Sequence, residues 1–168
     1  MTRPPAEGAR RITLLALLTA IALTIFLVEA QLPVLIPIPG VKLGLANIIT
    51  VYAMFVLGPF DALLILCARV FLGAVFSGQM MTLLFSAGGG LLSWLVLLLL
   101  RRLLTPGQIW LGSSVAAVFH NLGQLLVAAA VLRSWAVMAW LPYLLAGCAG
   151  AGLFTRLCAQ LFLSRLAP

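Results

Sequence analysis

Long runs of apolar residues alternate with short polar or proline-rich breaks along the chain. Because a bilayer core about 30 Å thick needs about 20 helical residues, and fewer where neighbours shield the span, each run predicts a membrane-spanning helix. Two of the runs are short and only "GPFD" divides them, which leaves a re-entrant pair open. The runs predict an all-α, polytopic membrane fold with six transmembrane helices: Ile12 to Val28, Leu43 to Leu57, Ala62 to Phe76, Met80 to Leu100, Leu111 to Leu132 and Trp135 to Thr155.

Positive charges at the ends of these runs predict the orientation. With the N-terminus in the cytoplasm, only Lys42 and Arg133 lie outside and Arg69 lies within the membrane. The positive-inside rule therefore places both termini in the cytoplasm, in the cell's inner (plasma) membrane. We expect one domain, residues 1–168, with residues 1–11 as a cytoplasmic tail. Seven arginines fall on the inner side: Arg3, Arg10, Arg11, Arg101, Arg102, Arg156 and Arg165.

The stretch "LPVLIPIPGVKLGLANIIT" begins in the predicted extracytoplasmic loop, residues 29–42, and continues into the second helix. Its three prolines cannot continue a helix, because each lacks an amide proton and restricts the residue before it. The loop is therefore predicted to be stiff, with the cation Lys42 at its end. It would lie at the mouth of any cavity that opens outward.

Composition supports a membrane protein and excludes several kinds of chemistry. Hydrophobic residues make up 64% of the chain and charged residues 8%. The net charge is +7, but most charged residues lie at the ends of the apolar runs, so no nucleic-acid partner is expected. Three acidic residues are too few for the paired aspartate motifs that hold magnesium against a diphosphate. The sequence has no Walker loop, no GxSxG elbow and no CxxC, and its cysteines are expected to be packed thiols. We expect no enzyme activity, catalytic residue, cofactor or metal site.

Ionisable residues at membrane depth are the most informative, because an unpaired charge there costs several kcal/mol. Glu29 lies at the outer end of the first span, and Arg69 lies near the middle of the third. Glu29 could pair with Arg69 or with Lys42.

The fifth span contains "VFHNLGQLL", in which His120 and Gln124 are one turn apart on one face, beside Asn121. Gly123 leaves room against the backbone. The group could bind a ligand, or it could be an interhelical polar cluster that fixes packing. A packing cluster needs partners from other helices, and the candidates are Asn47, Ser77, Gln79 and Ser86.

Small residues mark two further positions. "SAGGG" in the fourth span predicts close helix contact, with room for a ligand as the alternative. Ala16 and Ala20 lie four residues apart in the first span and form a patch on which another helix could dock.

The residues from about Glu29 to Val131 resemble a known family. "PGVKLGLAN", "SAGGGLLSWLV" and "AVFHNLGQLLVA" are similar, in this order, to the Gx transporter family, whose members are often labelled heptaprenyl diphosphate synthase component I. That family is similar in turn to the S components of energy-coupling factor vitamin transporters. The resemblance implies a six-helix bundle with a substrate pocket near the outer face, covered by the loop between helices 1 and 2. Arg69 stands roughly where many S components have an acidic residue.

The residues and the resemblance together predict a transport component that takes up a small, partly apolar, anionic molecule: a vitamin, flavin, quinone precursor or isoprenoid phosphate. The resemblance also implies a coupling transmembrane subunit and ATPase subunits as partners, with Ala16 and Ala20 at the contact. Alternatives are a non-catalytic scaffold for heptaprenyl diphosphate synthase or a quinone-linked redox system, and proton-coupled transport through Glu29 and His120. The candidate substrate-binding residues are Glu29, Lys42, Asn47, Arg69, His120, Asn121 and Gln124.

Overall fold

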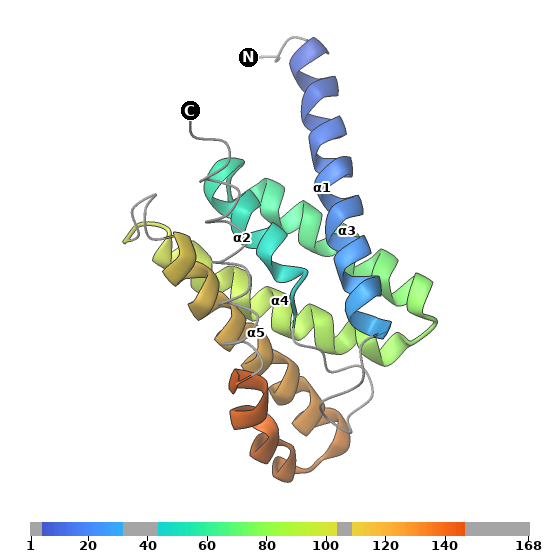
Figure 1. The fold of residues 1–168 in the computed structure, drawn as a ribbon, viewed down its shortest axis with the longest axis vertical. Coiled ribbons are helices and arrows are strands. Elements are labelled where there is room, and N and C mark those ends of the chain that lie inside the picture. The colour runs from blue at the N-terminus through green and yellow to red at the C-terminus, as the bar shows by residue number, and fades with distance from the viewer. Residues whose placement is uncertain (1–4, 32–43, 104–108, 147–168) are drawn as a thin grey trace.

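The computed structural model describes residues 5–31, 44–103 and 109–146, and the regular structure in these ranges is entirely helical (Figure 1). A short helical stretch, residues 141–146, follows the last labelled element. The prediction of an all-α fold is confirmed for this part of the chain. The elements in order are α1 (Pro5–Gln31), α2 (Asn47–Val56), α3 (Pro59–Ser77), α4 (Met80–Leu100), α5 (Ile109–Leu132) and the 3-10 helix η2 (Trp135–Trp140).

Four of these helices are long and apolar enough to cross a membrane: α1, α3, α4 and α5. The second predicted span is shorter than expected, because residues 44–46 form a turn and α2 covers only ten residues. The sixth predicted span is described as a short apolar stretch, Trp135–Ala146, and its remaining residues lie outside the described ranges. Most of the proline-rich loop, including Lys42, also lies outside them.

Glycine turns connect α2, α3 and α4 in tight succession. Gly58 precedes α3 with a φ of 111°, and Pro59 takes the first helical position, where its missing N–H is not needed. Gly78 ends α3 in the left-handed conformation (φ 65°), and α4 begins two residues later at Met80. Because glycine adopts these angles without steric cost, the three helices can fold back on one another within two-residue connections.

α4 and α5 form the most extensive helix pair, and glycines bring their backbones together. A Cβ added to Gly123 would lie 2.7 Å from the carbonyl oxygen of Gly88 and 2.8 Å from the Cα of Gly89. A Cβ on Gly88 would lie 2.3 Å from Cγ2 of Val127. The "SAGGG" segment therefore packs closely against α5, as predicted from the sequence.

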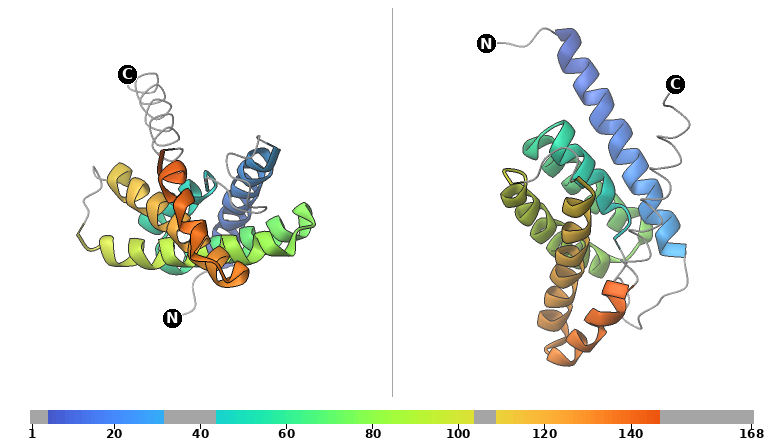
Figure 2. Two further views of the ribbon diagram at one scale, coloured as in Figure 1. Left: turned by 90° about the horizontal axis from the view of Figure 1, so that it is seen from below. Right: turned by 60° about the vertical axis from the view of Figure 1, so that its left-hand side comes forward.

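Figure 2 shows further views of the helices, between which two apolar clusters lie at different positions along α4 and α5. The first contains residues from all five α-helices and includes Leu18, Met54 and Leu97. The second lies between α4, α5 and the segment from η2 onward, and it includes Phe85 and Leu125. Along both α4 and α5, the buried residues between these clusters are polar or glycine, so a polar layer separates two apolar regions.

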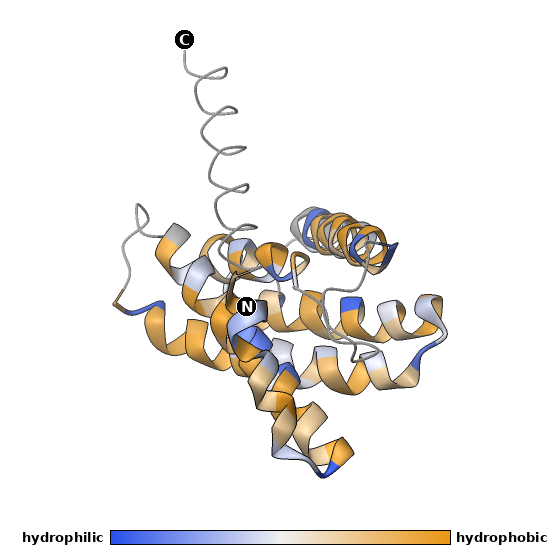
Figure 3. Cartoon of the chain, turned by 60° about the horizontal axis from the view of Figure 1, so that its bottom comes forward, coloured by the Kyte–Doolittle hydropathy of each residue, from blue (hydrophilic) through white to orange (hydrophobic). Residues whose placement is uncertain are grey.

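The outer surface of the helices is apolar, as lipid contact requires (Figure 3). In the most apolar 18-residue segment of α1, only 28% of the residues are buried inside the protein. The corresponding share is 44% in both α3 and α5. A shallow apolar groove of about 210 Å³ lies between α3 and α4 and is lined by residues that include Leu66 and Phe71. Cys67 is exposed in this groove, so its expected burial is wrong.

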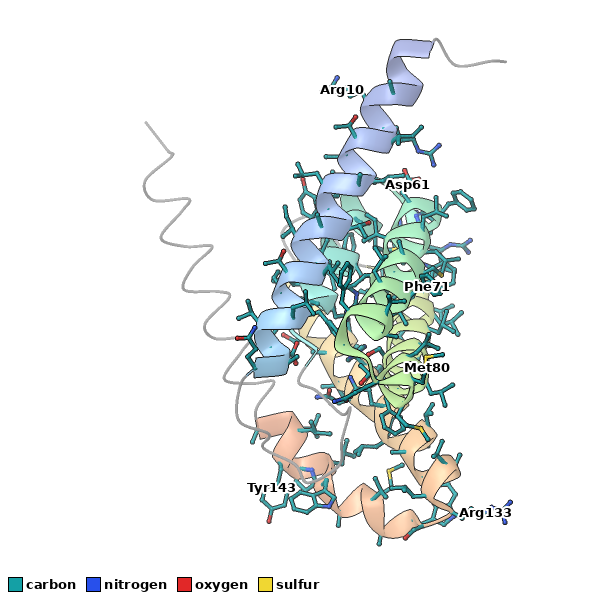
Figure 4. The ribbon with its side chains drawn as sticks, turned by 90° about the vertical axis from the view of Figure 1, so that its right-hand side faces the viewer. Arg10, Asp61, Phe71, Met80, Arg133 and Tyr143 are labelled. Carbon is teal, nitrogen blue, oxygen red and sulfur yellow. The ribbon has the colours of Figure 1, made fainter. Side chains whose placement is uncertain are left out.

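Ion pairing joins the second turn of α1 to the first turn of α3 at one end of the molecule. The guanidinium of Arg11 on α1 forms a salt bridge with Asp61 in the first turn of α3, and its Nε lies 3.0 and 3.1 Å from the two carboxylate oxygens. Figure 4 places Arg10 and Asp61 toward this end and Arg133 and Tyr143 toward the other. The starts of α1 and α3 therefore share one end of the bundle, and the α5–η2 connection lies at the opposite end.

Candidate functional site

The candidate site is the polar layer that lies between the two apolar clusters. Each of the five α-helices contributes at least one residue to this layer. Every member is less than 10% exposed, although each carries at least one polar group that prefers water. Burial of so many polar groups at membrane depth needs a compensating arrangement. We use the name polar layer for Glu29, Asn47, Thr50, Arg69, Ser86, Ser93, His120, Asn121 and Gln124.

Glu29 ties the end of α1 to the start of α2. Its carboxylate accepts two backbone hydrogen bonds, from the N–H of Gly44 at 2.7 Å and from the N–H of Leu45 at 3.0 Å. Gly44 has a φ of +79°, which turns these two successive N–H groups toward the carboxylate. Such a pair of amides is a recognised anion-binding arrangement, and here a side chain of the same protein occupies it.

Arg69 is the buried cation of the layer, about halfway along α3 and 2% exposed. The carboxylate of Glu29 attracts it electrostatically. Within the described residues, Nε and Nη2 of Arg69 nevertheless have no hydrogen-bond partner. Two charged N–H donors are therefore enclosed by the helices with no acceptor of their own.

His120 on α5 is held between two glycines of other elements. A Cβ on Gly44 would lie 2.4 Å from its Cδ2, and a Cβ on Gly89 would lie 3.1 Å from its Cε1. Its Nε2 lies 2.6 Å from Nε2 of Gln124, one turn further along α5. The imidazole thus fills the space that side chains at both glycines would need, and the charge of Arg69 acts on it.

The side chains of Asn47 and Asn121 form hydrogen bonds with different parts of the protein. Asn47 on α2 donates to the hydroxyl of Ser93 on α4 at 2.8 Å. Asn121 donates to the backbone carbonyl of Leu144 at 3.5 Å and so faces the segment after η2. Asn121 therefore contributes to a different side of the layer from its neighbour His120.

Several buried polar atoms of the layer are available to a bound molecule. Asn47 Oδ1, Thr50 Oγ1 and the two Arg69 nitrogens are buried without hydrogen-bond partners in the described part of the chain. Such atoms call for a bound water, ion or ligand, because an unpaired buried polar group is costly. In the same part of the chain, no three His, Cys, Asp or Glu side chains gather in a way that could hold a metal ion.

Two of the other sequence-predicted residues, Ala16 and Ala20, lie apart from this layer. Lys42 lies outside the described residues. Ala16 and Ala20 are both exposed on α1, on the same side as Thr13 and Thr24, and they form a shallow stripe of small residues. The apolar groove between α3 and α4 faces outward and contains none of the polar-layer residues.

Several members of the site could not have been identified from the sequence. The amides of Gly44 and Leu45 are backbone groups, which no residue pattern reveals. Gly44 precedes α2 and makes room for His120. Ser93 and Thr50 carry hydroxyls that are common in membrane helices, and only the fold brings them to the layer.

The fold and the site together define the class: a polytopic helical membrane protein whose interior holds a buried polar layer around one arginine. The family model described as heptaprenyl diphosphate synthase component I matches residues 18–162. The chain belongs to this family, as the sequence motifs indicated. No curated protein and no solved structure matches it.

Proposed function

We propose that the protein is a membrane transport component that binds a small, partly apolar, anionic molecule in the polar layer. The observation that carries this proposal is the enclosed guanidinium of Arg69, whose Nε and Nη2 have no acceptor among the described residues. A charged donor in this position is stabilised by an oxyanion, because hydrogen bonds between ionised groups are the strongest in proteins. A phosphate or carboxylate of a ligand would supply the missing acceptor.

The apolar part of the ligand follows from the surroundings of the layer. Apolar clusters lie on both sides of it along α4 and α5, so a molecule that extends from the head-group site in either direction contacts hydrocarbon. Vitamins, flavins, quinone precursors and isoprenoid phosphates combine an anionic or strongly polar group with such a part. His120, Gln124 and Asn47 are the side chains that we assign to the polar part of the ligand, with Lys42 at the entrance.

The transport mechanism that we infer is that of an S component, with six spans, cytoplasmic termini and energy from partner subunits. Support comes from the resemblance of the motifs and from the exposure of Ala16 and Ala20 on α1, where a coupling transmembrane subunit would dock. The proposal includes no catalytic role, because the residues needed for diphosphate chemistry are missing from the sequence. Two ATPase subunits would complete the assembly.

Mass spectrometry of the protein purified gently from its native membrane tests the proposal. We expect a co-purified small molecule with an acidic group, lost in Arg69→Ala but retained in Arg10→Ala, which removes an exposed arginine. Recovery of an ATPase in the same preparation would support the S-component mechanism. A preparation that repeatedly carries neither ligand nor ATPase would contradict the proposal.

The family description supports a second candidate, a non-catalytic membrane subunit of a heptaprenyl diphosphate synthase. This function predicts that a soluble prenyl synthase co-purifies with the protein. It also predicts that His120→Ala and Gln124→Ala leave the complex intact, since no ligand would then bind in the polar layer. Loss of a bound small molecule in these variants, with no synthase recovered, would exclude it.

A further inference from the structure

The carboxylate of Glu29 lies in a place that is suited to an external anion. Two successive backbone N–H groups, of Gly44 and Leu45, donate to it at 2.7 and 3.0 Å, and the charge of Arg69 attracts it. The side chain is 6% exposed and belongs to α1, whereas the amides belong to the turn before α2. Nothing in this arrangement requires that the oxyanion be covalently part of the protein.

The guanidinium of Arg69 supplies a second, independent indication of a missing ligand. Glu29 compensates its charge, yet Nε and Nη2 of Arg69 have no hydrogen-bond partner among the described residues. The amides of Gly44 and Leu45 donate to different oxygens of the Glu29 carboxylate. An oxyanion with three terminal oxygens, such as a phosphate monoester, could accept from these amides and from the guanidinium together.

We propose that Glu29 is a tethered substitute for the ligand's head group, and that a phosphate monoester with an apolar chain displaces it from the amides of Gly44 and Leu45. This inference rests on the proposed function and narrows it to a substrate class. The exchange breaks two hydrogen bonds from backbone amides to Glu29 and remakes them to the incoming phosphate, with no covalent change. Binding therefore detaches the end of α1 from the start of α2.

Affinity measurements on purified, full-length protein in nanodiscs test the exchange, with farnesyl phosphate as the probe and farnesol as its neutral counterpart. We expect Glu29→Gln to bind farnesyl phosphate at least tenfold more tightly than the natural protein, because an amide competes less well for the two N–H donors. Farnesol affinity should not change. Equal or weaker binding of farnesyl phosphate, or the same gain for farnesol, would overturn the inference.

Glu29→Asp separates displacement from simple electrostatics. Asp keeps the negative charge beside Arg69 but is shorter by one methylene, about 1.5 Å of reach, so it cannot hold both amides. Displacement predicts an affinity between those of the natural protein and Glu29→Gln, whereas a purely electrostatic effect predicts the natural value. Asp61→Asn, which removes a carboxylate paired with Arg11 at the far end of α3, should leave the affinity unchanged.

A spectroscopic measurement on the natural sequence does not depend on whether the variants fold. The chain has only two glutamates, Glu7 and Glu29, so ¹³Cδ-glutamate labelling gives two carboxylate signals, and Glu7→Gln assigns them. Saturating farnesyl phosphate should shift the Glu29 signal and leave that of Glu7 in place. Binding without a shift of the Glu29 signal would overturn the exchange alone, whereas absence of binding in every protein would overturn the proposed function as well.

Discussion

At the scale of single residues, burial of the charge of Arg69 is the feature that most needs explanation. A cation at mid-span is costly, and a helix bundle retains one where a counter-charge or a ligand compensates it. The sequence identified Arg69, Glu29 and His120 because ionisable residues are conspicuous in an apolar chain. It could not identify the hydrogen-bond donors to Glu29, since the amides of Gly44 and Leu45 acquire their role only through a positive φ.

Removal of the guanidinium should abolish binding without unfolding the protein. Arg69→Ala loses charged hydrogen bonds to the ligand, each of about 1.5–3 kcal/mol, so we expect Kd for farnesyl phosphate to rise by roughly ten- to a hundredfold per bond. Isothermal titration calorimetry measures the affinity, and a thermal melt reports the fold. Arg10→Ala is the matched control. A lower melting temperature with unchanged affinity would instead assign Arg69 a structural role.

A side chain at Gly44 should disrupt the site by contact with His120. Gly44→Ala places a Cβ 2.4 Å from Cδ2 of His120 and strains a residue at φ +79°. Overpacking costs about 1–3 kcal/mol, in addition to about 1–2 kcal/mol for the left-handed backbone. Gly78→Ala, in the left-handed region at φ 65° but with nothing within 4 Å, should carry only the backbone cost. Chemical denaturation of both variants separates the two terms, and equal destabilisation would refute the contact.

At the scale of elements, the sequence predicted α4 with its bounds and failed most clearly for α2. Met80–Leu100 follows a long apolar run that begins after Gly78 and ends at two arginines, so its limits are visible in the pattern. α2 is shorter than the apolar run that contains it, because residues 44–46 leave the helix to meet Glu29 and His120. Tertiary contacts of this kind override local periodicity.

Side chains added at the glycines between α4 and α5 should lower stability by amounts that depend on the atoms they contact. Gly123→Ala directs a methyl at backbone atoms of Gly88 and Gly89, which cannot move separately, whereas Gly88→Ala meets the side chain of Val127. We expect Gly123→Ala to lower stability more, by about 1–3 kcal/mol. Gly8→Ala, with nothing within 4 Å, is the control. Thermal melts in detergent measure the loss of stability in each variant. A larger loss of stability for Gly88→Ala than for Gly123→Ala would show that the helices can separate easily.

At the scale of the whole molecule, the apolar outer surface and the placement of the charged ends follow from composition. The sequence correctly indicated a membrane protein of this family, and the salt bridge of Arg11 with Asp61 puts the starts of α1 and α3 at one end, as the predicted topology requires. The height at which the polar groups meet did not follow from composition, because it depends on how the glycines of α4 and α5 set the helices against each other.

Bulky residues on the exposed stripe of α1 should prevent assembly while sparing the ligand site. Ala16→Trp and Ala20→Trp fill the surface on which a coupling subunit would dock, but both positions face away from the polar layer. We expect loss of ATPase recovery in affinity purification, with unchanged farnesyl phosphate affinity. Leu95→Trp, at an exposed position of α4, controls for a large side chain on the lipid-facing surface. Undiminished ATPase recovery in both alanine variants would exclude this stripe as the docking surface.

The shortness of α2 has a consequence for how the chain enters the membrane during synthesis. Ten residues span about 15 Å, roughly half of the hydrocarbon core, and half of these residues, including the polar Asn47 and Thr50, are buried by neighbours. Such a segment has too little hydrophobic length to be retained in the bilayer alone. We expect it to enter the bilayer together with α3, which follows after only two residues, and to be shielded mainly by α3 and α5, the helices that it contacts most.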